Sequence, residues 1–316
     1  MRQGDQTQCM LDCFAYLLER KGCDSRPLYS GVWESGYDID ETGIYYFSRR
    51  LDPKGWYERV QRLYNVSIVY WSIYKGGKEE RFDKFLAALN EAPGDGAFVL
   101  SVDLFYFPHS QQYRSKHVPH LVIFEVLPDG SWHLTDPYFS WAGPVDSRTL
   151  RDGLVNGIWF DTGSIHDVDT AAAAELFRRD IHLTPNPLIA DIERFVYQAV
   201  GQSGGQASST LFDSIQQTGV IAKRFEGYHI VCRYFAESSG EPMQTVASET
   251  AALLKGWESL LLTVARSSML NRTFDLPAFS AKLGTLNELE LAIRRRLLHS
   301  FAAWEARPQR AHSLRS

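Results

Sequence analysis

The alternation of apolar and polar residues divides the chain into a mixed N-terminal part and a helical C-terminal part. Up to about residue 165, apolar residues recur at both helix and strand spacing, whereas beyond it only the helical period remains. This pattern predicts an α+β fold with two domains, at 1–165 and 166–308, followed by a disordered tail at 309–316.

The N-terminal part begins with a predicted amphipathic helix. In residues 8–21 the apolar side chains fall on one side, and Gly22 is well placed to end the helix. Cys9 therefore lies at a helix N-terminus. Residues 24–43, rich in Gly, Ser and aromatic side chains, predict a loop. Three further elements are expected before the next strands: a helix at 54–64, a strand at 66–71 and a helix at 79–90.

Three segments with strand character follow, at 97–107, 120–127 and 131–137. The last two flank Pro128-Asp129-Gly130, a strong turn signal, so we predict that they pair as an antiparallel hairpin. His120 opens the first strand of this hairpin and Asp136 closes the second. Both side chains are therefore expected near the same end of the hairpin.

The C-terminal part predicts a helical domain. Helices are expected at 187–200, 226–237, 244–268 and 285–305, with a flexible break at 201–209. The run Arg294–Arg296 would suit docking of an acidic carrier protein, although a solvated helix face is the commoner reason for such a run.

Composition and charge narrow the class of protein. The net charge of -5 gives no reason to expect nucleic acid. No apolar stretch of about 18 residues occurs, so neither a membrane span nor a signal peptide is expected, and we predict a cytoplasmic location. Four cysteines in 316 residues are too few for a disulfide scaffold. The Cys9-x3-Cys13 spacing lacks a second ligand pair, so no metal site is predicted.

Cys9, His120 and Asp136 together predict nucleophilic chemistry. A thiol reacts as its thiolate, which the peptide dipoles at a helix N-terminus favour. A histidine can serve as its base when a third group fixes the imidazole tautomer. Alone, each of these residues would more often be structural, and Cys13 is most simply a core residue. The combination is what favours a catalytic triad.

Several motifs resemble papain-like cysteine enzymes. These carry a glutamine six residues before the nucleophile that donates to the oxyanion hole, and Gln3 stands six before Cys9. The bacteriocin-processing peptidase branch adds a small residue four after the nucleophile, a glycine thirteen after it, and a histidine strand followed by a strand ending in Asp-Pro. Cys13, Gly22, His120 and Asp136-Pro137 match, although Met10 replaces the usual glycine after the nucleophile.

The layout, with VDLFYFP at 102–108, looks more narrowly like the butirosin-biosynthesis acyltransferase family. The resemblance implies a papain-like domain, in which the nucleophile helix packs on an antiparallel sheet, followed by a helical domain. It also implies transfer of an acyl group from the thioester of an acyl or peptidyl carrier protein, through acyl-Cys9, to an amine in natural-product biosynthesis. Gln3 would stabilise the oxyanion. No cofactor is expected beyond the donor's phosphopantetheine arm, which is part of the substrate.

Two other functions remain open at this point. The same triad would serve a cysteine peptidase, amidase or thioester hydrolase, with water as the acceptor. Alternatively, the chain would be a non-catalytic binding or scaffold protein, with the helical half forming a homodimer. Trp33, Tyr37 and His117 are candidates for substrate binding. His109 could also bind substrate, although an exposed loop histidine is more often a bystander.

Overall fold

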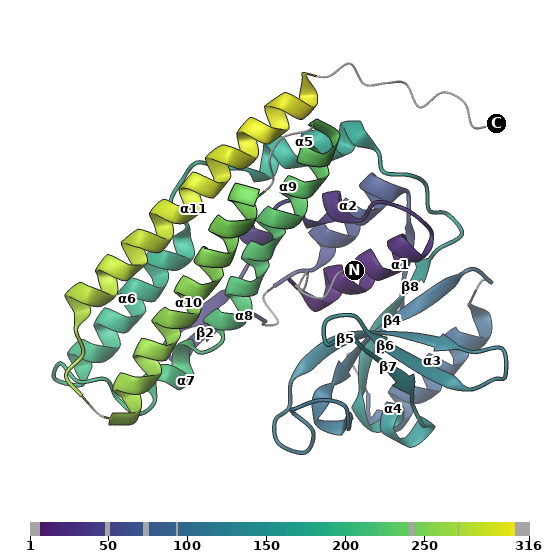
Figure 1. The fold of residues 1–316 in the computed structure, drawn as a ribbon. Helices are drawn as coiled ribbons and strands as arrows, with labels where there is room; N and C mark the ends of the chain where they lie inside the picture. The colour runs from purple at the N-terminus through teal and green to yellow at the C-terminus, as the bar shows by residue number, and fades with distance from the viewer. Residues whose placement is uncertain are drawn as a thin grey trace. The chain divides into compact units, whose positions relative to one another are not determined.

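The computed structural model describes residues 7–47, 51–71, 76–92, 94–239, 244–270 and 272–306. The chain forms two compact units (Figure 1). The first holds the described chain up to Leu28 and Pro53–Ala173, and the second holds Tyr29–Asp52 and the chain from Ala174 onward. The predicted α+β class is confirmed. The division of the chain into domains at residue 165 stays a prediction. In the structure, residues 29–52 also group with the helical half.

The first unit is built on a six-stranded antiparallel sheet with the order β3-β8-β4-β5-β6-β7. Its strands are β3 (Ser67–Trp71), β4 (Gly96–Asp103), β5 (Pro119–Val126), β6 (Trp132–Asp136), β7 (Trp141–Pro144) and β8 (Leu154–Asp161). The predicted hairpin is confirmed, since β5 pairs antiparallel with β6 through Ile123↔Thr135. Gly130 takes the left-handed conformation that the turn requires, with φ of 81°.

Helices cover both faces of this sheet (Figure 1). They are α1 (Cys9–Arg20), α2 (Lys54–Tyr64), α3 (Lys78–Glu91) and α4 (Ser147–Gly153), with short 3-10 turns η1 (Arg26–Tyr29) and η3 (Leu104–Tyr106). Successive strand residues point to opposite faces, so Trp159 packs on Phe98 in the core beneath α3, while Phe160 meets Phe14 of α1. Helix α1 is thus anchored on the sheet by burial of its apolar side.

Two strand predictions differ from the structure. The strand expected at 97–107 ends at Asp103, because the Asp103 carboxylate accepts a hydrogen bond from the Phe105 N–H at 3.1 Å and starts η3. No strand was expected at β8, which lies between β3 and β4. Asn156 and Gly157 interrupt its apolar alternation, and its place in the sheet comes from pairing with partners far away in sequence.

The second unit is helical, as predicted. It contains the end of α5 (Thr170–Asp180), then α6 (Pro187–Gln202), α7 (Leu211–Ile215), α8 (Thr218–Ala222), η4 (Lys223–Phe225), α9 (Glu226–Ser239), α10 (Gln244–Leu270) and α11 (Leu276–Glu305). The long helices α9, α10 and α11 pack along one another, and α6 packs on α11 (Figure 1). Helix α11 begins earlier than the predicted residue 285, because the Asp275 carboxylate accepts from the Ala278 N–H and caps it.

The loop predicted at 24–43 is structured, and its part from residue 29 onward belongs to the helical unit. It forms a 3-10 turn and a small hairpin, η2 (Val32–Glu34), β1 (Asp38–Asp40) and β2 (Gly43–Tyr45). Trp33 stacks on Tyr228 of α9 at a ring separation of 4.4 Å, and Glu34 makes an ion pair with Arg294 of α11 at 2.7 Å. These contacts explain why the segment belongs to the helical unit.

Arg294 is part of a buried polar network. Its side chain is 1% exposed and bonds Glu290 at 2.6 Å, the Tyr228 hydroxyl at 2.7 Å and the His182 carbonyl at 2.9 Å. Asn186, the N-cap of α6, donates to the same Glu290 carboxylate. The expectation that Arg294 lies on a solvated or docking face is therefore wrong, because its charge is neutralised inside the helical unit.

Three other sequence expectations concern cysteines, membranes and the tail. All four cysteines are free thiols. Within the described part of the chain, no helix is long and apolar enough to cross a membrane. The tail at 309–316 lies outside the described residues.

Candidate active site

Cys9 is the first residue of α1, at the end of the helix where free peptide N–H groups gather. Gln8 precedes it in an extended conformation, and Met10 and Leu11 are buried, so the helix start is fixed against the sheet unit. Gly22, with φ of 82°, ends the helix through the two backbone bonds of a Schellman motif. The predicted helix is confirmed, and the Cys9 side chain is half-buried.

The segment before Cys9 is tied to the helix by a buried carboxylate. Asp12 is fully buried and accepts hydrogen bonds from the Thr7 N–H at 3.2 Å and the Thr7 hydroxyl at 3.4 Å. Asp12 was not among the predicted site residues. The sequence marks it only as a polar residue on the apolar side of the helix. Its bonds to Thr7 fix the direction from which the chain enters α1.

Cys13 lies one turn deeper and is fully buried. Its thiol lies 3.5 Å from the Leu121 carbonyl of β5. Burial raises the pKa of Cys13 well above its ordinary value, and the negative charges of Cys9, Asp136 and Asp12 add to the effect. Cys13 therefore remains a neutral thiol, as its predicted core role requires.

His120 and Asp136 meet at one end of the β5–β6 hairpin. The His120 Nε2 lies 3.0 Å from both oxygens of Asp136 and hydrogen bonds Oδ1. The exposed fractions of the two side chains are 6% and 0%. The Phe139 N–H, in the turn after Asp136-Pro137, also donates to Oδ1 at 3.1 Å. This arrangement fixes the ring orientation of His120.

The Cys9 thiol is the second partner of the His120 ring. Since Nε2 faces Asp136, Nδ1 is the nitrogen that remains for the hydrogen bond to Cys9. Burial opposes a charge on the ring, but the hydrogen bonds and negative charges of Asp136 and Cys9 outweigh burial and raise the pKa of His120 from 6.5 to about 10. His120 thus lies between the Asp136 carboxylate and the Cys9 thiol.

Asp136 stays ionised despite its burial. Burial alone would raise its pKa, but the nearby His109 ring, the hydrogen bond and positive charge of His120 and the Phe139 N–H lower it. The ionised carboxylate can offset a positive charge on His120, whereas a protonated carboxyl group could not.

Aromatic rings enclose the imidazole of His120. Phe139 lies 5.0 Å and Tyr138 5.6 Å from it, measured between ring centroids. Phe139 is 41% exposed, so it forms a wall that faces solvent on its outer side. Both rings follow the Asp-Pro turn, which the sequence had marked only for its aspartate.

His109 is not the exposed bystander that its loop position predicted. Its side chain is 6% exposed and stacks flat on Trp141, with centroids 3.8 Å apart. Its Nε2 lies 3.6 Å from Asp136 Oδ2. No local sequence pattern marks this contact, because Trp141 is brought to the site by its pairing with Asp136 across β6 and β7.

The remaining predicted residues lie elsewhere or cannot be placed. Gln3 lies outside the described residues. His117 is 65% exposed, bonds Asp103 at 2.6 Å and stacks on Phe105. Trp33 is buried in the helical unit, and the Tyr37 hydroxyl bonds Asp191 there. Substrate binding by Trp33, Tyr37 and His117 stays a prediction.

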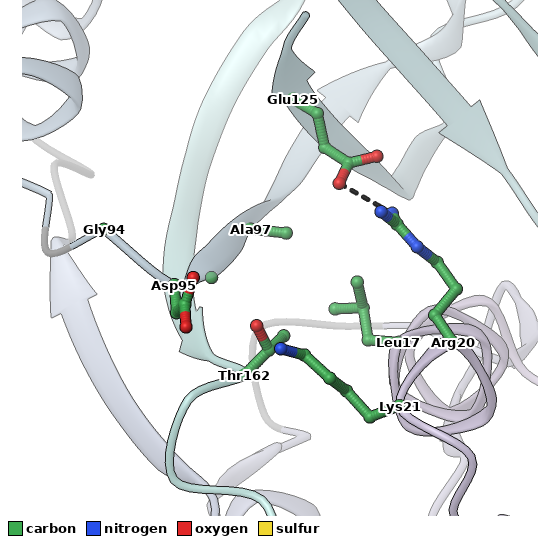
Figure 2. Close-up of a pocket in the computed structure, with 9 residues that line it drawn as sticks. Leu17, Arg20, Lys21, Gly94, Asp95, Ala97, Glu125 and Thr162 are labelled. Atoms are coloured by element: carbon green, nitrogen blue, oxygen red, sulfur yellow. Dashed lines mark hydrogen bonds and ion pairs between the residues drawn. The ribbon is translucent and has the colours of Figure 1, made fainter.

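A cavity of about 370 Å³ opens at the other end of α1 (Figure 2). Arg20 and Lys21 face Asp95 and Glu125 there, and Arg20 pairs with Glu125 at 2.6 Å. Arg20 is eleven residues from Cys9, about 17 Å along the helix. The cavity is therefore separate from the site at Cys9. Across the described residues, no group of three or more His, Cys, Asp or Glu side chains is arranged to hold a metal ion.

Comparison with known proteins extends over nearly the whole chain. Residues 6–169 match the family profile described as the DUF6005 N-terminal domain, and residues 171–315 match the DUF6005 C-terminal domain. The chain is also 23% identical to petrobactin synthase of Bacillus anthracis over 312 residues, which cover 95% of each protein.

Proposed function

Because the chain belongs to the DUF6005 family, with both family domains in order, we propose that it is a cysteine acyltransferase of natural-product biosynthesis. It would move an acyl group from a carrier-protein thioester, through acyl-Cys9, to an amine. The observation that carries the proposal is the position of His120 between Asp136 and Cys9. Similarity to petrobactin synthase along 95% of both chains supports a biosynthetic enzyme.

The first half of the reaction transfers the acyl group to the enzyme. The Cys9 thiolate attacks the thioester carbonyl, a new S–C bond forms, and the carrier's sulfur leaves and takes the proton of His120 Nδ1. The donor already carries the activation in its thioester, so the exchange needs no nucleotide. The phosphopantetheine arm of an acyl or peptidyl carrier protein would present that thioester.

The second half transfers the acyl group to the acceptor. An amine attacks acyl-Cys9, neutral His120 takes a proton from the nitrogen, and the Cys9 thiolate leaves. Charge on the carbonyl oxygen would be stabilised by the Cys9 N–H, which has no acceptor in a preceding helical turn, and by the predicted Gln3 amide. Asp136 stabilises the imidazolium each time that it forms.

Transfer to an amine competes with hydrolysis. Water attacks the same intermediate unless the site excludes it or holds the amine in place. The rings of Phe139 and Tyr138 beside His120 support a partly dry site.

Intact-mass analysis tests the proposal. The protein is mixed with a panel of aliphatic and aromatic acyl thioesters of N-acetylcysteamine, which reproduces the end of a carrier arm. We expect an acyl adduct on the wild type that is lost in Cys9→Ala. Cys13→Ala, the same substitution one turn along α1, is the matched control and should keep the adduct.

Addition of an amine panel to the acylated protein then separates the possible outcomes. Formation of amide supports the transferase. Release of free acid with every amine would favour a hydrolase or peptidase instead. Failure of every thioester to form an adduct at Cys9 would refute the proposed chemistry and favour a scaffold role.

A further inference from the structure

Two buried polar atoms of the site face each other without a hydrogen bond. Among the described residues, neither His109 Nε2 nor Asp136 Oδ2 has a hydrogen-bond partner, and they lie 3.6 Å apart. A buried donor left unpaired costs about 1–3 kcal/mol, so such a group in a folded protein calls for an explanation. A shift of a few tenths of an ångström would close this gap to a normal hydrogen bond.

The surroundings hold His109 in this orientation. Its ring lies parallel to Trp141, with an interplanar angle of 4°, and the Phe107 ring approaches it at 6.0 Å. Trp141 is itself fixed, because it pairs with Asp136 across strands β6 and β7. The strand that carries the carboxylate therefore also positions the ring that faces it.

We propose that His109 is a positioning residue of the triad, whose Nε2–H donates to Asp136 Oδ2 and keeps Asp136 ionised and turned toward His120. The role rests on the proposed cysteine chemistry, but it requires no particular acyl donor or acceptor. The role requires a proton on His109 Nε2, the nitrogen that faces Asp136 Oδ2. A positive charge on His109 would compete with His120 for the negative charge of Asp136 and weaken the interaction between Asp136 and His120.

The two oxygens of the Asp136 carboxylate differ in their hydrogen bonds. Oδ1 accepts from His120 and from the Phe139 N–H, while Oδ2 lies 3.0 Å from His120 Nε2, whose hydrogen bond goes to Oδ1, and 3.6 Å from His109 Nε2. The titratable groups that interact with Asp136 are His109, His120 and the Cys13 thiol, and Cys9 joins them through His120. Loss of the His109 donor would make Asp136 easier to protonate and would neutralise the triad at a higher pH.

Two substitutions of His109 separate the effect of its Nε2–H from the effect of its stacking on Trp141. His109→Phe keeps a flat ring on Trp141 but removes the donor, whereas His109→Gln keeps an N–H near the same position but removes the ring. The readout is the rate of Cys9 alkylation by iodoacetamide between pH 3.5 and 10, followed by intact mass. This reaction reports the thiolate and needs no substrate.

We expect His109→Phe to shift the acid limb of the alkylation profile upward by about one pH unit, a roughly tenfold lower rate on that limb. His109→Gln should restore most of the difference. Equal shifts in both variants, or an unchanged acid limb in His109→Phe, would overturn the inference. Should acyl transfer fail while these shifts appear, the positioning role stands and the proposed acceptor chemistry falls.

A measurement on the unmodified protein covers the case in which His109→Phe does not fold. Nitrogen-15 spectra of histidine-labelled protein distinguish the two neutral tautomers. The inference requires that His109 carry its proton on Nε2 near pH 7. A proton on Nδ1 alone would overturn it.

Discussion

Replacing Asp136 by asparagine removes the charge that holds His120 protonated and leaves a side chain of the same shape. The amide that replaces the carboxylate offers an N–H as well as an oxygen to His120 Nε2, and donation from it would favour the wrong imidazole tautomer. We therefore expect His120 to lose its proton near neutral pH and Cys9 to return to a thiol.

The size of the effect follows from the pKa of His120. A rise from 6.5 to about 10 corresponds to about 5 kcal/mol at 1.36 kcal/mol per unit. Burial opposes this rise, so Asp136 and Cys9 together contribute more than that sum. An equal share gives Asp136 at least about 2.5 kcal/mol, which is roughly a 70-fold loss of the thiolate–imidazolium pair.

Alkylation of Cys9 by iodoacetamide across the pH range tests this expectation. From neutral pH upward, the wild type should react at a nearly constant rate until His120 titrates near its pKa of about 10. Asp136→Asn should react about 70-fold more slowly at pH 7 and gain rate steadily as the pH rises. Asp129→Asn, which removes an exposed carboxylate from the turn of the same hairpin, is the matched control. A wild-type rate and profile in Asp136→Asn would refute the reasoning.

Three further outcomes concern stability. Asp136 has a lowered pKa in the fold, so its charge stabilises the protein above its ordinary pKa of 3.8, and this contribution is lost as the pH falls through the folded value. The difference in unfolding free energy between wild type and Asp136→Asn, from urea titrations, should therefore shrink below about pH 4. Glu290→Gln should cost about 3 kcal/mol, because Arg294 loses a buried partner, and should lower the urea midpoint. Gly31→Ala should cost about 2 kcal/mol and lower the melting temperature, since Gly31 has φ of 75° and an added Cβ would lie 2.8 Å from Asp180.

Two of these stability outcomes have a matched control. Glu249→Gln removes the partner of Arg296 on the surface and should cost under about 1 kcal/mol. Gly284→Ala, in α11 where an added Cβ meets nothing, should stabilise by up to about 1 kcal/mol. Equal effects of the two glutamine variants, or equal losses in both alanine variants, would contradict the assigned causes. A stability difference for Asp136→Asn that stays constant into acid would contradict the lowered pKa.

The parts of the fold that were predictable are those encoded by neighbours in sequence. The start of α1 follows from apolar spacing and Gly22, and the β5–β6 hairpin follows from the turn at Gly130. Strand β8 was not predictable, because its place between β3 and β4 depends on pairing with residues about 50 to 95 positions away.

In the candidate site, too, contacts between sequence neighbours were predictable and contacts between distant residues were not. The meeting of His120 with Asp136 was predictable because one short turn joins their strands. The burial of His109 was not, since it depends on a stack with Trp141 from another strand. The ion pair of Glu34 with Arg294 spans still more of the chain, and no local pattern marks it.

The membership of residues 29–52 in the helical unit has a consequence for how the protein is made. Trp33 leaves the ribosome 195 residues before its partner Tyr228, a wait of roughly 10 to 40 s at ordinary rates of synthesis. A fragment starting at Ala174 would lack both Trp33 and Glu34, and Arg294 would keep a buried charge with one partner fewer. The helical half is therefore not a module that can be exchanged by a single cut in the gene, and any chimera must carry residues 29–52 along with it.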